Sequence, residues 1–314
     1  MTVATRIWAV HLAVLALLLA GGFLLPAYHQ TNVAKVMVLA TYAMGYNIAF
    51  GYTGLLSLGH ALFFGAGLYG AGMLVQHAGV GAGPAALAGI VAGGLAAAVV
   101  GLLALRTQGV AFMIVTLMFA QAGYLTILYN TAWTRGDEGI VIAREARVLM
   151  GFDLSADLPR YFVGLGLFAA GLVLKLWLVR SPTGRVMVAL RENEERSRML
   201  GYDPYARKLA ALVISGLYAG AAGAAYGLLF GYVGASLAST QYSILPLLWV
   251  LLGGAGTVLG PLVGALLMFY LIDYSSAFTT ASLLVVGAAL VLLVLFAPKG
   301  ILGTLRDRWL KWLP

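Results

Sequence analysis

The chain has no cysteine and few charged side chains. Of its 314 residues only 10% are Asp, Glu, Lys or Arg, whereas 62% are hydrophobic. The lack of cysteine excludes disulfides and thiolate metal sites. Soluble domains carry charge on about a quarter of their residues, so this composition excludes an ordinary soluble protein.

Several signatures of enzyme chemistry are also missing. No Gly-Lys dipeptide occurs, so the sequence contains no P-loop to hold nucleotide phosphates. The patterns HExxH and GxSxG are absent as well. The four histidines, His11, His29, His60 and His77, lack the spacing of zinc ligands. We therefore expect no enzyme, and no metal or cofactor bound by this chain.

Long apolar runs recur along the whole chain. Each is long enough to cross the roughly 30 Å of a bilayer's hydrocarbon core as a helix, and the alternating segments of a β-barrel are absent. The predicted fold is an all-α, polytopic helical membrane bundle forming a single domain over residues 1–314. Its ten predicted segments are 7–25, 33–50, 54–76, 85–105, 110–130, 161–179, 209–231, 236–253, 258–274 and 281–297. The first is interpreted as a retained span rather than a signal peptide, because no clear A-x-A site follows it.

The distribution of charge predicts the orientation. Residues 180–208, the coupling segment of this article, hold seven basic and four acidic side chains, and each would cost about 3 kcal/mol in mid-membrane. The basic excess places this segment in the cytoplasm, whereas loop 131–160, with four basic and five acidic residues, belongs outside, in the periplasm. The tendency of basic residues to stay on the cytoplasmic side also explains the net charge of +8, so this charge does not indicate a nucleic-acid partner. Counting spans places both termini in the cytoplasm, in agreement with the basic tail of Lys299, Arg306, Arg308 and Lys311.

Two apolar stretches are interrupted by glycine. They are "GYTGLLSLGHALFFG" (51–65) in the first half and "LLGGAGTVLGPLVG" (251–264) in the second. One broken pair in each half is typical of an internal repeat whose broken helices line a substrate path. The candidate path residues are Ser57, His60, Gly253, Gly254, Gly256 and Thr257. The alternative is that the glycines only let helices pack closely and that His60 makes a helix–helix hydrogen bond.

The coupling segment carries strong helix-capping signals. Ser181-Pro182 predicts the start of one short amphipathic helix, Gly201 its stop, and Asp203-Pro204 the start of the next helix. Two favourable i,i+4 pairs lie between them, Glu192–Arg196 and Glu194–Arg198. Such capping favours a folded element that docks a partner, while a loop that only sets topology is the alternative.

Five stretches resemble one family. The coupling segment with the next helix, "ALRENEERSRMLGYDPYARKLAALVISGLYAGAAGAAYG" (189–227), is similar to that of LivM-like permeases of branched-chain amino acid ABC importers. The others are "GYTGLLSLGHALFFGAGLYG" (51–70), "TRGDEGI" (134–140), "LLGGAGTVLGPLVGA" (251–265) and "APKGILG" (297–303). They occur in the family's order between residues 33 and 303.

The resemblance implies a permease in the bacterial inner membrane, paired with a sister permease as a heterodimer. A periplasmic binding protein would deliver the substrate, and ATPase subunits would hydrolyse ATP with Mg²⁺. The residues that would dock to the ATPase are Ala189, Arg191, Glu192, Asn193, Glu194 and Gly201. Where importers usually place a hydrophobic-Pro element, this chain has Tyr202-Asp203-Pro204.

The implied substrates are branched-chain or related hydrophobic amino acids. Urea, amides and small aromatic acids are alternatives within the same family. An ATPase-independent carrier or channel is a further alternative. Its ion-coupled form is disfavoured, because no ionisable residue lies squarely in the middle of a predicted span.

Overall fold

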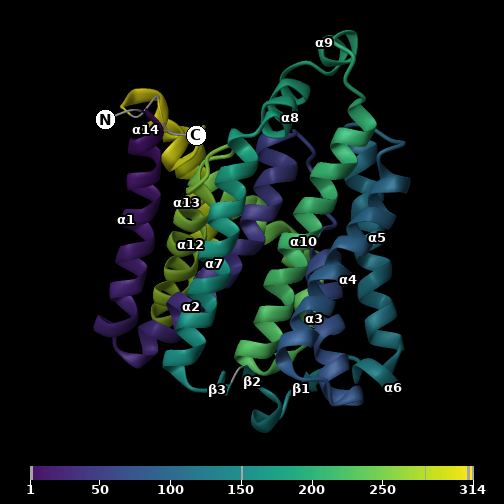
Figure 1. Ribbon diagram of the computed structural model, residues 1–314, viewed down its shortest axis with the longest axis vertical. Coiled ribbons are helices and arrows are strands. Elements are labelled where there is room, and N and C mark those ends of the chain that lie inside the picture. Colours follow the sequence, from purple (N-terminus) through teal and green to yellow (C-terminus); the bar gives the residue numbers. More distant parts are fainter. Residues whose placement is uncertain (1–2, 150, 280, 310–311, 313–314) are drawn as a thin grey trace.

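The computed structural model describes residues 3–149, 151–279, 281–309 and 312. Over these ranges it contains fourteen α-helices and four strands of two residues each, which confirms the all-α prediction. The long helices run roughly side by side (Figure 1). Helices α8 and α9 lie at one end of the bundle, together with the start of α1 and with α14, while α6 and β1–β3 lie at the other. Lys311 of the predicted basic tail lies outside the described residues.

The elements have the following bounds. The helices are α1 Val3–Leu24, α2 Ala27–Asn47, α3 His60–Ala78, α4 Ala82–Ala104, α5 Val110–Tyr129, α6 Thr131–Thr134, α7 Asp157–Arg180, α8 Pro182–Glu192, α9 Glu194–Met199, α10 Pro204–Phe230, α11 Thr240–Gly253, α12 Gly260–Phe278, α13 Ser282–Phe296 and α14 Ile301–Arg308. A π-helical turn, η1 (Ile48–Tyr52), extends α2. The strands form two antiparallel pairs, β1 (Ile140–Val141) with β4 (Tyr232–Val233) and β2 (Val148–Leu149) with β3 (Phe152–Asp153).

Seven of the helices are long and apolar enough to cross a membrane: α1, α2 with η1, α4, α5, α7, α10 and α12. The other three predicted apolar segments correspond to α3, α11 and α13. Helix α11 has only 14 residues, because it ends at Gly253, inside the second glycine-rich interruption. A multi-pass membrane architecture is therefore confirmed.

Small residues bring α10 against α3 and α4. A Cβ atom added to Gly93 of α4 would lie 2.5 Å from the Gly220 Cα and 2.7 Å from the Gly216 oxygen of α10. On α3, a Cβ on Gly67 would lie 2.2 Å from the Gly220 oxygen. Helices in lipid associate through such close backbone packing, because the lipid tails are as apolar as the side chains. These glycines therefore hold the centre of the bundle together.

The gap between the two helices of the first interrupted pair is longer than the predicted segment bounds imply. The expected segments 33–50 and 54–76 become a helix that continues through η1 to Tyr52 and a helix α3 that begins only at His60. The start of α3 is capped from another helix, because the Ser243 hydroxyl of α11 accepts a hydrogen bond from the Ala61 amide at 2.9 Å. No local pattern shows a cap that comes from so far along the chain.

The prediction of one helix between Ser181 and Gly201 was wrong. The chain is extended at Asn193 (φ −158°), which separates α8 from α9, and the Asn193 Oδ1 accepts a hydrogen bond from the Arg196 amide at 2.8 Å. Asn193 is thus an N-cap that the sequence analysis overlooked. Because it separates Glu192 from Arg196, their predicted ion pair is absent among the described residues.

The other capping predictions for this segment are confirmed. The Ser181 hydroxyl accepts a hydrogen bond from the Gly184 amide, Asp203 caps α10 through the Tyr205 amide, and Gly201 has a positive φ of 87°. Glu194 pairs with Arg198 at 3.8 Å, as predicted, and also with Lys208 at 2.5 Å. The coupling segment is therefore a folded element tied to the start of α10.

Gly93→Ala should destabilise the protein by about 1–3 kcal/mol, because the added methyl group overpacks the contact between α4 and α10. Thermal unfolding of the purified protein in detergent measures the effect as a lower midpoint. The matched control is Gly166→Ala on the exposed face of α7, where a Cβ meets no atom within 4 Å. Equal midpoints for the two variants would contradict the close packing.

Candidate functional site

The two glycine-rich interruptions meet inside the bundle. The Asn47 side chain at the end of α2 donates to the Thr257 oxygen at 2.7 Å and accepts from the Gly256 amide at 2.9 Å. A Cβ on Gly51 would lie 2.5 Å from that same amide nitrogen. Residues 48–59 and 254–259 therefore form one packed unit, called the junction below.

Three basic side chains from three different helices hold the junction. Lys175 of α7 donates to the Thr257 and Val258 oxygens, both at 3.3 Å, and Arg306 of α14 donates to the Gly256 oxygen at 3.0 Å. Arg191 of α8 donates to the Gly51 oxygen. Carbonyl groups that a broken helix leaves without partners must be satisfied when they are buried. In the junction, Lys175, Arg191 and Arg306 donate these hydrogen bonds.

Lys175 is the functional candidate that the sequence analysis missed. It is fully buried and forms no ion pair with a described carboxylate, and its Nζ lies 5.7 Å from the centroid of the Tyr52 ring. Its position five residues before Arg180 is typical of a lysine at the membrane interface. The one signal against that interpretation is that Lys175 shares its helix face with the buried residues Phe168 and Leu172.

The predicted path residues lie in or beside the junction. Ser57, His60 and Thr257 are fully buried. The Nε2 of His60 lies 2.7 Å from the Ser215 hydroxyl oxygen, while its Nδ1 has no hydrogen-bond partner among the described atoms. The structure brings Gly256 and Thr257 onto Asn47 and places Gly253 and Gly254 at the end of α11. Their role in a substrate path stays a prediction.

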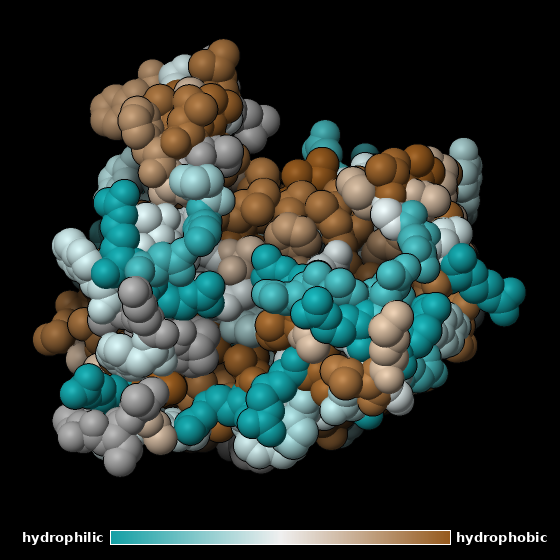
Figure 2. All heavy atoms as spheres, turned by 90° about the horizontal axis from the view of Figure 1, so that it is seen from above, coloured by the Kyte–Doolittle hydropathy of each residue, from teal (hydrophilic) through white to brown (hydrophobic). Residues whose placement is uncertain are grey.

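The predicted docking residues divide into two groups. Ala189, Glu192, Asn193 and Gly201 are exposed at the α8–α9 end, where hydrophilic side chains cover much of the surface (Figure 2). A cavity of about 820 Å³ opens beside them, between α8, the α4–α5 turn and the start of α10. Arg191 is exposed as well, but its guanidinium donates to the Gly51 oxygen, and Glu194 is held by Lys208. Arg191 therefore links the coupling segment to the junction.

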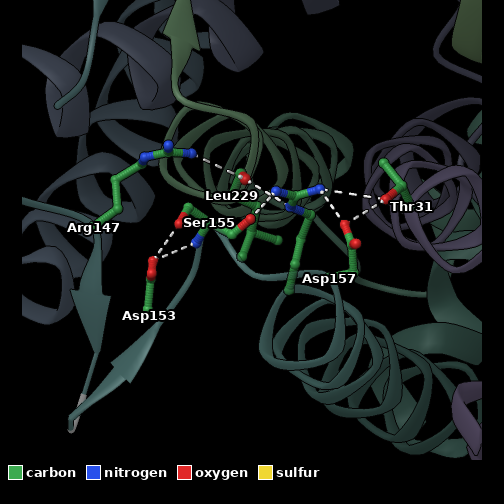
Figure 3. Close-up of polar contacts among 7 residues, drawn as sticks. Thr31, Arg147, Asp153, Ser155, Asp157 and Leu229 are labelled. Atoms are coloured by element: carbon green, nitrogen blue, oxygen red, sulfur yellow. Dashed lines mark hydrogen bonds and ion pairs between the residues drawn. The ribbon is translucent and has the colours of Figure 1, made fainter. Parts of the chain in front are cut away.

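A second polar cluster lies at the opposite end of the bundle (Figure 3). Arg160 donates to the Leu229 oxygen at 3.1 Å, to Asp157 at 3.2 Å and to the Thr31 hydroxyl at 3.3 Å, and it also donates to the Ser155 oxygen. These contacts tie the loop before α7 to the end of α10 and to α2.

The loop itself is held by Asp153 and Arg147. Hydrogen bonds from the Ser155 hydroxyl and amide, and then the Arg144 guanidinium, lower the pKa of Asp153 to about 2. Burial and the nearby positive charge of Arg160 lower the pKa of the Arg147 guanidinium. The buried Nε of Arg147 has no partner among the described atoms. This end of the molecule therefore carries an incompletely satisfied positive charge.

Asn47→Leu should lower the free energy of unfolding by about 1–3 kcal/mol, the range for one orphaned buried donor. The Gly256 amide loses its acceptor, whereas the Thr257 oxygen keeps the hydrogen bond from Lys175. Thermal unfolding in detergent measures the change, with the exposed Asn130→Leu as the matched control. An unchanged unfolding midpoint for Asn47→Leu would show that the bridge is not needed.

Comparisons with known proteins show the family of this chain. The model of the family "Branched-chain amino acid transport system / permease component" matches residues 31–295. Two relatives are each named High-affinity branched-chain amino acid transport system permease protein LivM. The one from Escherichia coli (strain K12) is 30% identical over 98% of this chain and 77% of its own length. The one from Salmonella typhimurium (strain LT2) is 29% identical over 95% of this chain and 75% of its own length.

No solved structure matches the chain. The family match contains both halves of the junction, the coupling segment and the end of α10. The resemblance noted in the sequence is therefore confirmed over most of the chain. This protein belongs to the family of permease components of branched-chain amino acid transport systems.

Proposed function

We propose that this chain is a transmembrane subunit of an ABC importer for branched-chain or related hydrophobic amino acids. Family membership and the names of the two relatives support the transport role and the substrate class. The observation that carries the coupling part of the proposal is the hydrogen bond from Arg191 of α8 to Gly51 in the junction.

In the proposed orientation, ten helices cross the bacterial inner membrane and the α8–α9 end faces the cytoplasm. Seven basic residues in the coupling segment support a cytoplasmic location for this end, because basic loops are retained on the cytoplasmic side. The start of α1 and α14 lie at the same end, and loop 131–160 then faces the periplasm (Figure 1). A periplasmic binding protein would deliver substrate at that face.

The ATPase subunits would dock on the exposed side of the coupling segment. Its exposed residues include Ala189, Glu192 and Asn193. Beside them, Met199 and Leu200 expose 86% and 71% of their surface, although both are apolar and the segment is polar. Apolar side chains clustered on a polar protrusion are typical of a protein interface. The chain's own sequence contains no P-loop, so ATP with Mg²⁺ would be hydrolysed by these partners.

Movement of α8 would pass to the transport helices through the junction. Arg191 connects α8 to Gly51, and Asn47 connects that half to Gly256 and Thr257. Displacing α8 would therefore change both interrupted helix pairs together, as alternating access requires. With a sister permease supplying the other wall, the path would open to each side of the membrane in turn.

Two substitutions on α8 separate docking from transmission. Glu192→Lys should reduce the amount of cognate ATPase that co-purifies with the permease, because Glu192 lies on the exposed side. Arg191→Met should keep the ATPase bound but lower ATP-driven uptake of leucine into proteoliposomes about tenfold, since it removes one charge-assisted hydrogen bond. Arg185→Met, an exposed arginine on the same helix, is the matched control and should leave both measurements unchanged.

The same experiment tests the proposal as a whole. Leucine uptake without ATPase or ATP would favour a carrier or channel. ATP-driven uptake of urea, amides or small aromatic acids, with none of leucine, would overturn the substrate class. Full uptake by Arg191→Met would show that α8 acts through other contacts.

A further inference from the structure

A continuous column of aromatic rings runs through the bundle between α2, α3, α10 and α11. Successive ring centroids lie 4.9 to 6.4 Å apart, within the range of aromatic pairs. From the end of α10 inward, the rings are Phe230, Tyr226, Phe64, Tyr242, Tyr42 and Trp249. This set is called the aromatic column below.

Two cations lie over the first ring of the column. The Nζ of Lys35 is 5.4 Å and the Arg160 guanidinium carbon 5.8 Å from the centroid of the Phe230 ring. Arg160 is occupied by Asp157, Thr31 and two backbone oxygens. Lys35 forms no ion pair with any described carboxylate. Of these two cations, Lys35 is therefore the one that can bind an incoming anion.

Tyr46, on the same helix as Tyr42 of the column, contacts the junction. Tyr46 follows Tyr42 by one turn of α2, and its ring lies 4.6 Å from the ring of His60. The Tyr46 hydroxyl donates to the Ser57 oxygen at 3.1 Å. The column therefore connects the outer cationic cluster with two of the residues that the sequence predicted for the path.

One edge of the column is only partly buried. Tyr42 and Phe64 are fully buried, whereas Lys35, Tyr226 and Phe230 are half-buried. Lys35 lies eight residues into α2, which corresponds to about 12 Å along the helix axis. A lysine at a lipid-facing position within the membrane costs about 3 kcal/mol, so such residues usually face a protein partner or a water-filled path.

We propose that the half-buried edge of the aromatic column, formed by Phe230, Tyr226 and Tyr242, is this chain's wall of the solute path and that Lys35 binds the carboxylate of the solute. The inference rests on the proposed function and adds the residues that would contact the solute. The ligand is an α-amino acid with an apolar side chain. Its carboxylate pairs with Lys35, its ammonium group lies over the ring of Tyr226, and its apolar side chain packs on the half-buried edge of the column.

The geometry also suits passage rather than tight binding. The half-buried rings of Phe230, Tyr226 and Tyr242 each offer part of a face to an apolar side chain, so neighbouring positions along this edge hold the solute comparably. Conduction needs several weak sites in sequence rather than one strong site, because the solute must leave as well as enter. Lys35 at the outer end accepts the solute where the binding protein would release it.

The test uses the assembled importer in proteoliposomes, with this chain, its sister permease, the ATPase subunits and the binding protein. ATP-driven uptake of radiolabelled L-leucine is measured for Lys35→Met and Lys35→Arg. We expect uptake to fall about tenfold or more in Lys35→Met and to recover largely in Lys35→Arg, which keeps the charge. Complex assembly and ATP hydrolysis should be unchanged. Lys299→Met, an exposed lysine between α13 and α14, is the matched control.

The outcomes separate this inference from the proposed function. Absence of ATP-driven leucine uptake by the unmodified complex refutes the proposed function. Normal uptake by an intact Lys35→Met complex refutes the inference alone. If Lys35→Met does not assemble, Tyr226 decides: Tyr226→Leu should lower uptake and Tyr226→Phe restore it, and equal uptake by all three forms would overturn the proposal.

Discussion

The structure depends on how it satisfies backbone groups where its helices are interrupted. Inside a membrane protein, each carbonyl or amide released by a broken helix needs a partner, because water is not there to replace it. Here the partners are the Asn47 amide and the side chains of Lys175, Arg191 and Arg306. The glycines allow the two interruptions to touch, and the polar side chains make that contact stable.

The three basic side chains of the junction also connect three different helices to it. Lys175 comes from α7, Arg191 from α8 and Arg306 from α14, and all three end on the junction. The junction also contacts Tyr46, which follows Tyr42 of the aromatic column by one turn of α2 and packs against His60. A displacement at the coupling segment and a change along the proposed solute path therefore share one set of hydrogen bonds.

Much of the architecture could be predicted from local patterns. Apolar runs predicted ten segments that correspond to ten of the fourteen described helices, and the caps at Ser181, Gly201 and Asp203 were recognised from residue type alone. The two errors were also local in origin. Asn193 was taken as the interior of a helix although its side chain caps α9, and the start of α3 was placed early because its cap, Ser243, belongs to α11.

Composition and short-range pattern by themselves determined the membrane class, the positions of both interruptions and the family resemblance, because each depends on residues close together in the chain. Only the tertiary structure decided which side chains form hydrogen bonds with the backbone groups of the interruptions. Asn47 and Thr257 are 210 residues apart, Arg191 and Gly51 are 140, and Lys175 and Val258 are 83. A local pattern can place Lys175 on a buried helix face, but it does not identify the distant carbonyl that the lysine contacts, since that depends on the packing of helices far apart in the sequence.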